Sequence, residues 1–155
     1  MNFKLKLSLA IYIANILIMI AIGLAFELKS EFMPFHSDVI QADWKNVDSQ
    51  AKILYLGMMR TEGAGFLAAA TALIILLYFP FRNLEKWSFS AMTIIGVVEY
   101  FPSLLANYHI SSITSASPPW LLMLLLTLSL FLALIFANVG YSEIGVQSEA
   151  GKQSI

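Results

Sequence analysis

The chain has 155 residues, 59% of them hydrophobic and only 12% charged, and its formal net charge is −1. Soluble domains rarely have this composition, and a nearly neutral chain offers no basic surface to nucleic acid. Because the chain has no cysteine, disulfides, thiolate metal sites and c-type haem attachment are excluded. We expect an integral membrane protein that needs no cofactor.

Four apolar runs are long enough to cross a bilayer, whose hydrocarbon core of ~30 Å takes about 20 helical residues. They cover residues 5–26, 48–79, 88–108 and 120–138. The sequence therefore predicts an all-α polytopic protein, with four transmembrane helices in an antiparallel bundle. We place this single domain at residues 1–140 and expect a polar, flexible tail over residues 141–155.

The first run has an alternative interpretation as a signal peptide. Lys4 and Lys6 precede it, and Gly23-Leu24-Ala25 resembles a cleavage site. The apolar run is longer than the 7–15 residues usual in signal peptides, which favours a membrane span.

The longest connection, residues 27–50, is expected on the outer side of the membrane. Its Phe32-Met33-Pro34-Phe35 run is apolar and interrupted by proline, and Trp44 is typical of an interfacial anchor. We predict an ordered cap over the outer end of the bundle, with His36 and Trp44 as its candidate residues.

Two local features shape the second and third runs. Asn46 or Asp48 can cap the second helix through a side-chain oxygen. In the third run Glu99 is followed by Pro102. This proline removes a helix hydrogen bond and is expected to bend the helix about one turn from the charge.

The distribution of lysine and arginine predicts the orientation, because cytoplasmic connections carry more of them. The inner side would carry Lys4, Lys6, Arg82, Lys86 and Lys152, and the outer side Lys29, Lys45 and Lys52. We therefore expect a bacterial-type plasma (inner) membrane protein with both termini in the cytoplasm.

The stretch Met59-Arg60-Thr61-Glu62-Gly63-Ala64-Gly65 places two opposite charges in an apolar helix. A charge at the bilayer centre costs roughly 2.5–3.5 kcal/mol on insertion scales, so such residues face protein or water. Arg60 and Glu62 point to nearly opposite sides of a helix and cannot pair. Small residues flank Arg60 at helical spacing, which predicts that Arg60 points into the bundle.

Glu99 is the expected partner of Arg60. The two residues have similar predicted depths on antiparallel spans, and each lies in a stripe of small residues. Three interpretations stay open: a structural ion pair that sets the helix register, a ligand or proton site built on that pair, and a neutral Glu99 without an arginine partner.

Glu62 lies on the other face of its helix, near Tyr55, Met58 and Phe66. Its carboxyl is either protonated and hydrogen-bonded to the backbone or a tyrosine, or it anchors an amine or hydroxyl of an apolar ligand. The candidate polar cluster is therefore Arg60, Glu62, Glu99 and Tyr55, and none of the four is assigned a catalytic role.

His36 and His109 are the two histidines of the chain. A transition-metal site with nearby acids is one interpretation. The sequence shows no pair at metal-ligand spacing, so we predict interfacial hydrogen bonding and no metal.

A resemblance to a known family rests on three motifs. They are Met33-Pro34-Phe35-His36, Trp44, and Met59-Arg60 followed by Gly63 and Gly65. Together they resemble a functionally uncharacterised family of small four-helix bacterial inner-membrane proteins. The resemblance covers most of the chain and implies a fold and a location, not an activity.

Two further likenesses are in layout alone. Emopamil-binding and sigma-2-receptor-like proteins place buried acids around a sterol-like ligand, but the first span here has no matching acid. The membrane glutathione-transferase-like family shares size and helix number. It expects arginine followed by asparagine and glutamate, where this chain has Thr61-Glu62-Gly63.

The leading functional hypothesis is a non-enzymatic binding or accessory protein. Its partners would be the lipid bilayer and a lipophilic small molecule or another membrane protein. The alternative is a membrane enzyme or carrier that uses a buried glutamate as acid/base on a lipophilic substrate. A purely structural role in a larger complex is a third class.

Three structural arrangements would distinguish a binding protein, an enzyme and a structural protein. A cavity lined by Glu62, Tyr55 and aromatic rings favours binding. Two carboxyls that converge on one cavity favour catalysis, and an unbroken core around the ion pair favours structure.

Overall fold

The computed structural model describes the backbone of residues 1–153 and the side chains of residues 1–145. The long helices are α1 (Phe3–Leu28), α3 (Ser49–Leu76), α4 (Lys86–Ile113) and α5 (Trp120–Gln153). The short ones are α2 (Pro34–Ile40), η1 (Trp44–Asn46) and η2 (Leu77–Phe81), which continues α3 as a π-helix. Residues 1–153 contain no strand.

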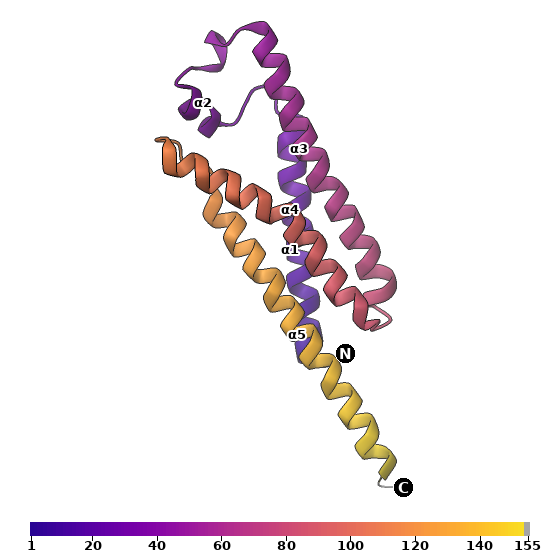
Figure 1. The fold of residues 1–155 in the computed structure, drawn as a ribbon. Coiled ribbons are helices and arrows are strands. Elements are labelled where there is room, and N and C mark those ends of the chain that lie inside the picture. The colour runs from indigo at the N-terminus through magenta and orange to yellow at the C-terminus, as the bar shows by residue number, and fades with distance from the viewer. Residues whose placement is uncertain (154–155) are drawn as a thin grey trace.

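Four of these helical segments are long and apolar enough to cross a membrane: α1, α3 with η2, α4, and α5. Successive long helices run in opposite directions and form one bundle (Figure 1). α1 packs against α3 and α5, while α4 packs against α5 and, over a shorter stretch, against α3. The predicted all-α, multi-pass membrane architecture is confirmed.

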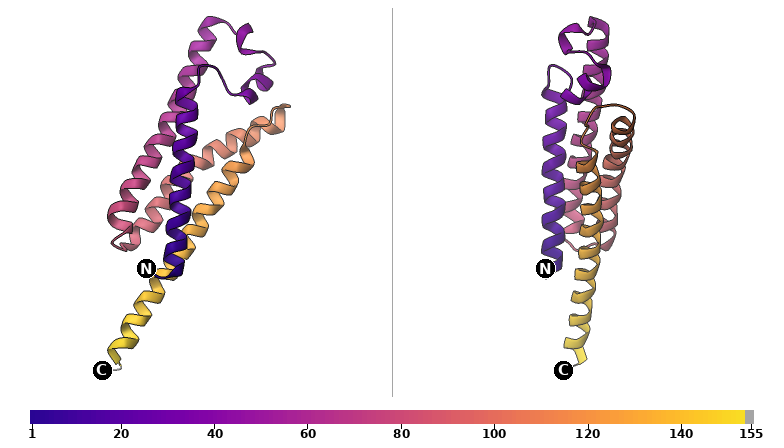
Figure 2. Two further views of the ribbon diagram at one scale, coloured as in Figure 1. Left: turned by 180° about the vertical axis from the view of Figure 1, so that it is seen from behind. Right: turned by 90° about the vertical axis from the view of Figure 1, so that its left-hand side faces the viewer.

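The two ends of the bundle are named here after the predicted orientation. The outer end carries α2 and η1, and at the opposite, inner end α1 begins and α5 leaves the bundle (Figures 1 and 2).

Side-chain caps explain where α1 and α3 begin. Asn2 Oδ1 accepts a hydrogen bond from the Leu5 N–H at 3.1 Å. Asp48 Oδ1 accepts from the N–H groups of Gln50 and Ala51 at 3.0 and 2.9 Å. Of the two candidate caps for the second span, the structure uses Asp48, and a cap of this kind contributes about 1 kcal/mol.

The inner half of the bundle has a packed aromatic core. The rings of Phe81 and Phe89 meet edge to face with centroids 5.2 Å apart, and Tyr12 meets Phe81 at 5.8 Å. The Tyr12 hydroxyl donates to the Phe89 carbonyl at 3.0 Å and lies 2.9 Å from Thr93 Oγ1. The Tyr12 hydroxyl is therefore satisfied inside the protein, as a low-dielectric interior requires.

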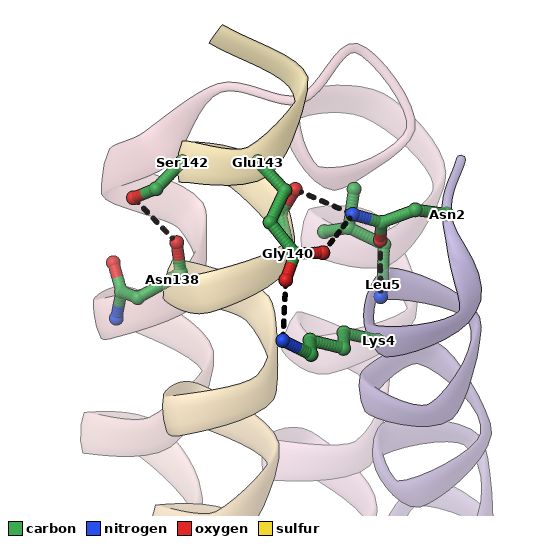
Figure 3. A network of polar contacts seen from close by, with 7 residues as sticks. All are labelled: Asn2, Lys4, Leu5, Asn138, Gly140, Ser142 and Glu143. Carbon is green, nitrogen blue, oxygen red and sulfur yellow. Dashed lines mark hydrogen bonds and ion pairs between the residues drawn. The ribbon is translucent and has the colours of Figure 1, made fainter. Parts of the chain in front are cut away.

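Polar contacts join the N-terminus to α5 at the inner end (Figure 3). Asn2 Nδ2 donates to the Gly140 carbonyl and to Glu143 Oε2, each at 2.9 Å, and Lys4 forms an ion pair with Glu143. A Cβ at Gly140 would come within 2.8 Å of Asn2 Oδ1 and 2.9 Å of Leu5 Cγ, so this close approach requires glycine.

These contacts lie where the predicted tail begins. The fourth span was expected to end near residue 138, followed by a flexible tail from residue 141. α5 continues as one helix to Gln153, and its turn at residues 140–143 is held to the N-terminus. The helix is thus longer than the expected span, and the flexibility of residues 141–155 stays a prediction. For the side chains of residues 146–155 the prediction falls outside the described part of the chain.

α4 parts from α3 toward the outer end. Pro102 lies inside α4 and has no N–H to donate to the preceding turn, which bends a helix. Figure 1 shows that the C-terminal half of α4 leans away from α3, and Figure 2 shows the same divergence from behind. The bend expected from the sequence is therefore seen in α4.

Candidate functional site

A cavity of about 650 Å³ lies at the outer end, where α4 diverges from α3. All four long helices contribute to its walls, and Met33, Phe35 and His36 line it from the α2 segment. This segment lies over the gap between α3 and the outer ends of α4 and α5 (Figure 1). Pockets that take small organic molecules have volumes of roughly 300–1,000 Å³, so the cavity is large enough for one.

The bend in α4 shapes one wall. Every lining residue that α4 contributes lies at or beyond the proline: Pro102, Ser103, Ala106, Asn107 and Ile110. Ser103 and Ala106 are small, so this wall is hollowed. The proline and these short side chains together account for the space.

The lining is mostly apolar. Phe26 comes from α1, Phe66 from α3 and Met123 from α5, and Phe35 adds a further ring from α2. Four polar side chains are spread among them: His36, Glu62, Ser103 and Asn107. An apolar surface with a few placed polar groups is typical of a binding site for a small organic molecule.

Glu62 provides the one charged side chain of the lining. Its side chain is exposed, so it stands at the rim of the cavity. Together with Met58 it also borders a shallower hollow on the outside of α3, formed with Ile53, Leu54, Gly57 and Thr61. Glu62 therefore borders both hollows.

Glu99 lies beside the cavity without lining it. Its Oε1 is 3.4 Å from the position that a Cβ on Gly65 would take. Gly65 lies one turn after Glu62 on the same face of α3. The absence of a side chain at Gly65 thus leaves room for a second, half-buried carboxyl next to Glu62.

The structure does not show the predicted ion pair between Arg60 and Glu99. Within residues 1–145 the structure has one ion pair, between Lys4 and Glu143, and the Arg60 side chain is exposed instead of pointing into the bundle. The physical reason is the register of α1 and α3. A Cβ on Gly63 would lie 2.8 Å from the Gly23 carbonyl and 3.2 Å from Glu27 Cγ.

Gly63 is therefore level with the outer end of α1, and Arg60 lies about 4.5 Å farther out at 1.5 Å per residue. At that level an arginine can extend toward water and needs no buried partner.

The predicted cap is ordered around Phe32, which is buried at 5% exposure. Its ring lies edge-on to Trp44 at 4.9 Å and to Tyr55 at 5.8 Å. The Lys52 ammonium lies 5.5 Å from the centroid of the Trp44 ring. Tyr55 and Trp44 thus hold the cap to α3, and neither lines the cavity.

His36 joins the cap to the cavity. Its ring meets Phe35 at 4.3 Å, and burial lowers the pKa of His36 below its usual value. Nδ1 accepts a hydrogen bond from the Met33 N–H at 3.3 Å. A neutral imidazole carries one proton, so the proton lies on Nε2, which is left as a donor.

Within the described side chains, no three histidine, aspartate or glutamate residues come together in a group that could hold a metal ion. His36 takes part in the cap, and His109 is exposed near the outer end of α4.

Comparisons of the chain with protein-family models, curated proteins and solved structures found no match. The resemblance to a family of small four-helix inner-membrane proteins stays a prediction.

Sequence reasoning placed Glu62 beside Met58 and Phe66, and the structure puts all three on the cavity. It missed Phe32, Phe35 and Asn107. The apolar run around Pro34 was a signal for the first two, because a buried ring is needed to hold a short loop helix in place. The signal for Asn107 was its position beyond Pro102, on the half of α4 that moves away from α3.

Proposed function

We propose that this protein is a membrane-embedded binding protein that holds a lipophilic small molecule in the outer cavity. The observation that supports this most is the cavity itself, with a volume of about 650 Å³, mostly apolar walls and few polar groups. A packed core around an ion pair would have favoured a purely structural role, and that ion pair is absent from the described residues.

The membrane and the orientation are part of the same proposal: a bacterial-type inner membrane, with both termini in the cytoplasm. The bias of lysine and arginine supports it, and the start of α1 and the inner part of α5 lie at one end of the bundle (Figure 1). Reporter fusions after Trp87 and after Gly140 should both report cytoplasm. A periplasmic signal from either fusion would overturn the orientation.

An enzyme or carrier that acts on the same ligand is the second candidate. One observation favours it: the Glu99 carboxyl packs on Gly65, one turn from Glu62. Because Glu99 does not line the cavity, only one carboxyl is placed to touch a ligand, and this favours binding. Chemical change of a bound molecule on incubation with the protein would favour the second candidate.

The binding proposal is tested by mass spectrometry of organic extracts from gently purified protein. Ala106→Phe should fill the cavity, because Ala106 lines it. Ala68→Phe is the matched control, because Ala68 is exposed on α3 and lines none of the hollows described here. We expect a small molecule with the natural chain and with Ala68→Phe, and its loss with Ala106→Phe. Identical extracts from both folded variants would contradict the proposal.

A further inference from the structure

We infer that the ligand is a cationic amphiphile whose protonated amine lies against Glu62 and whose apolar body lies among the aromatic rings of the cavity. This inference rests on the proposed function and deepens it, because it gives the charge and the chemical class of the ligand.

The cavity lining is acidic and has no basic residue. The lining contains the carboxyl of Glu62 and no lysine or arginine. Arg60 is near in sequence, but it projects from a nearly opposite side of α3 and its side chain is exposed. In the part of the chain with described side chains, the one ion pair lies at the inner end, between Lys4 and Glu143. No basic side chain described here therefore pairs with Glu62.

The second carboxyl strengthens this argument. Glu99 is half-buried in the contact between α3 and α4, with Oε1 3.4 Å from the Cβ position of Gly65. The carboxylates of Glu62 on α3 and Glu99 on α4 repel each other when both are charged. A positive group beside them lowers the free-energy cost of this repulsion. A ligand ammonium at Glu62 supplies that positive charge, whereas the exposed Arg60, which was expected to pair with Glu99, does not.

The rest of the lining tolerates a cation. Phe26, Phe35 and Phe66 bring three aromatic rings to the cavity, and a ring face attracts an ammonium group. Burial lowers the pKa of His36 and so favours its neutral form, which does not repel a cation. An anionic head group would instead be repelled by Glu62, and the lining has no basic residue to offset this repulsion.

The test uses three probes with the same apolar body: phenylbutylamine, phenylbutanol and phenylbutyrate. Binding to the protein in zwitterionic nanodiscs is measured by calorimetry at pH 7, with empty nanodiscs as the blank. A hydrogen bond to a charged group is stronger than one between neutral groups, so we expect the amine to bind about tenfold or more tightly than the alcohol. The carboxylate should bind most weakly.

Different results would contradict the cationic ligand and the binding function. Equal affinities of amine and alcohol, both lost in Ala106→Phe, would overturn the cationic ligand and leave the binding function standing. Tightest binding by the carboxylate would also overturn it. Binding of all three probes that is unchanged by Ala106→Phe would place them outside the cavity and contradict the binding function as well.

A variant series makes the role of Glu62 explicit. Glu62→Gln keeps the size of the side chain and removes its charge, so amine affinity should fall about tenfold while alcohol affinity stays within about twofold. Glu31→Gln is the control, because Glu31 is exposed in the outer connection and does not line the cavity. Equal losses in the two variants would contradict a specific contact at Glu62. If Glu62→Gln does not fold, comparison of the three probes on the natural chain still tests whether the ligand is cationic.

Discussion

The inner and outer halves of the bundle use the same four helices and pack them in opposite ways. At the inner end, Phe81, Phe89 and Leu130 expose at most 1% of their surface. Tyr12 is buried with its hydroxyl satisfied by Phe89 and Thr93. At the outer end α4 diverges from α3, and a cavity of about 650 Å³ remains between the helices.

This difference separates stability from binding. The inner half closes because aromatic rings from η2, α1 and α4 fill the space between the helices. The outer half stays open because Pro102 bends α4 and small side chains follow it. Substitutions of the inner core rings should therefore act on stability, and substitutions of the cavity-lining side chains on ligand binding.

The largest effect is expected in the inner core. Phe89→Ala removes a fully buried ring and should lower stability by about 3–5 kcal/mol. Phe35→Ala, which removes a half-buried ring from the cavity wall, should cost less than about 1 kcal/mol. Thermal melts in detergent measure both. Similar melting temperatures for the two variants would break the contrast between the halves.

A pair of glycines in α3 gives the next effect. A Cβ at Gly63 would meet the Gly23 carbonyl at 2.8 Å, whereas one at Gly57 meets nothing within 4 Å. Gly63→Ala should therefore push α1 from α3 and cost about 1–3 kcal/mol. Gly57→Ala should be neutral or stabilise by up to about 1 kcal/mol, because alanine favours a helix over glycine. The same melts test this, and equal costs would mean that α1 and α3 meet in another register.

The cap should show the smallest effect, a dependence on pH. Burial lowers the pKa of His36, whereas a histidine in the unfolded chain titrates near about 6.5. The unfolded cap then binds the proton more readily than the folded cap. The contribution of His36 to the stability of the folded cap is therefore full above pH ~6.5 and is lost as the pH falls further.

Trp44 reports on the cap because its ring lies 4.9 Å from Phe32. In a chain with Trp87 and Trp120 replaced by phenylalanine, Trp44 emission should shift to longer wavelength as the pH falls from 7 to 5. His36→Gln should abolish the shift. A shift that persists in His36→Gln would assign it to another group.

Hydrophobic runs were sufficient to predict the four helices, but not their ends. The third span was expected over residues 88–108, and α4 covers Lys86–Ile113. Apolar composition marks only the part of a helix suited to lipid, while capping and turn residues decide where the helix stops. Thr114 is extended at the end of α4, and hydropathy carries no information about this.

The polar site was harder to predict. Equal depth made Arg60 and Glu99 a reasonable pair, but the depth of Arg60 depended on how far α3 extends past α1. The contact of Gly63 with Gly23 sets that relation, and no local pattern in either helix reveals which small residues meet. The cavity arises from a divergence between helices; the sequence predicted the bend at Pro102 but not the cavity that lies beside it.

Photolabelling tests the central claim most directly. An amphiphile that carries a protonated amine and a diazirine would be irradiated with the protein in nanodiscs, and the labelled residues mapped by mass spectrometry. The account predicts label on residues 58–66 of α3 and 103–110 of α4, which phenylbutylamine competes away and which Glu62→Gln reduces. Label spread over lipid-facing positions such as Ile74 and Ile75, which are exposed on α3, and insensitive to the competitor would contradict the account.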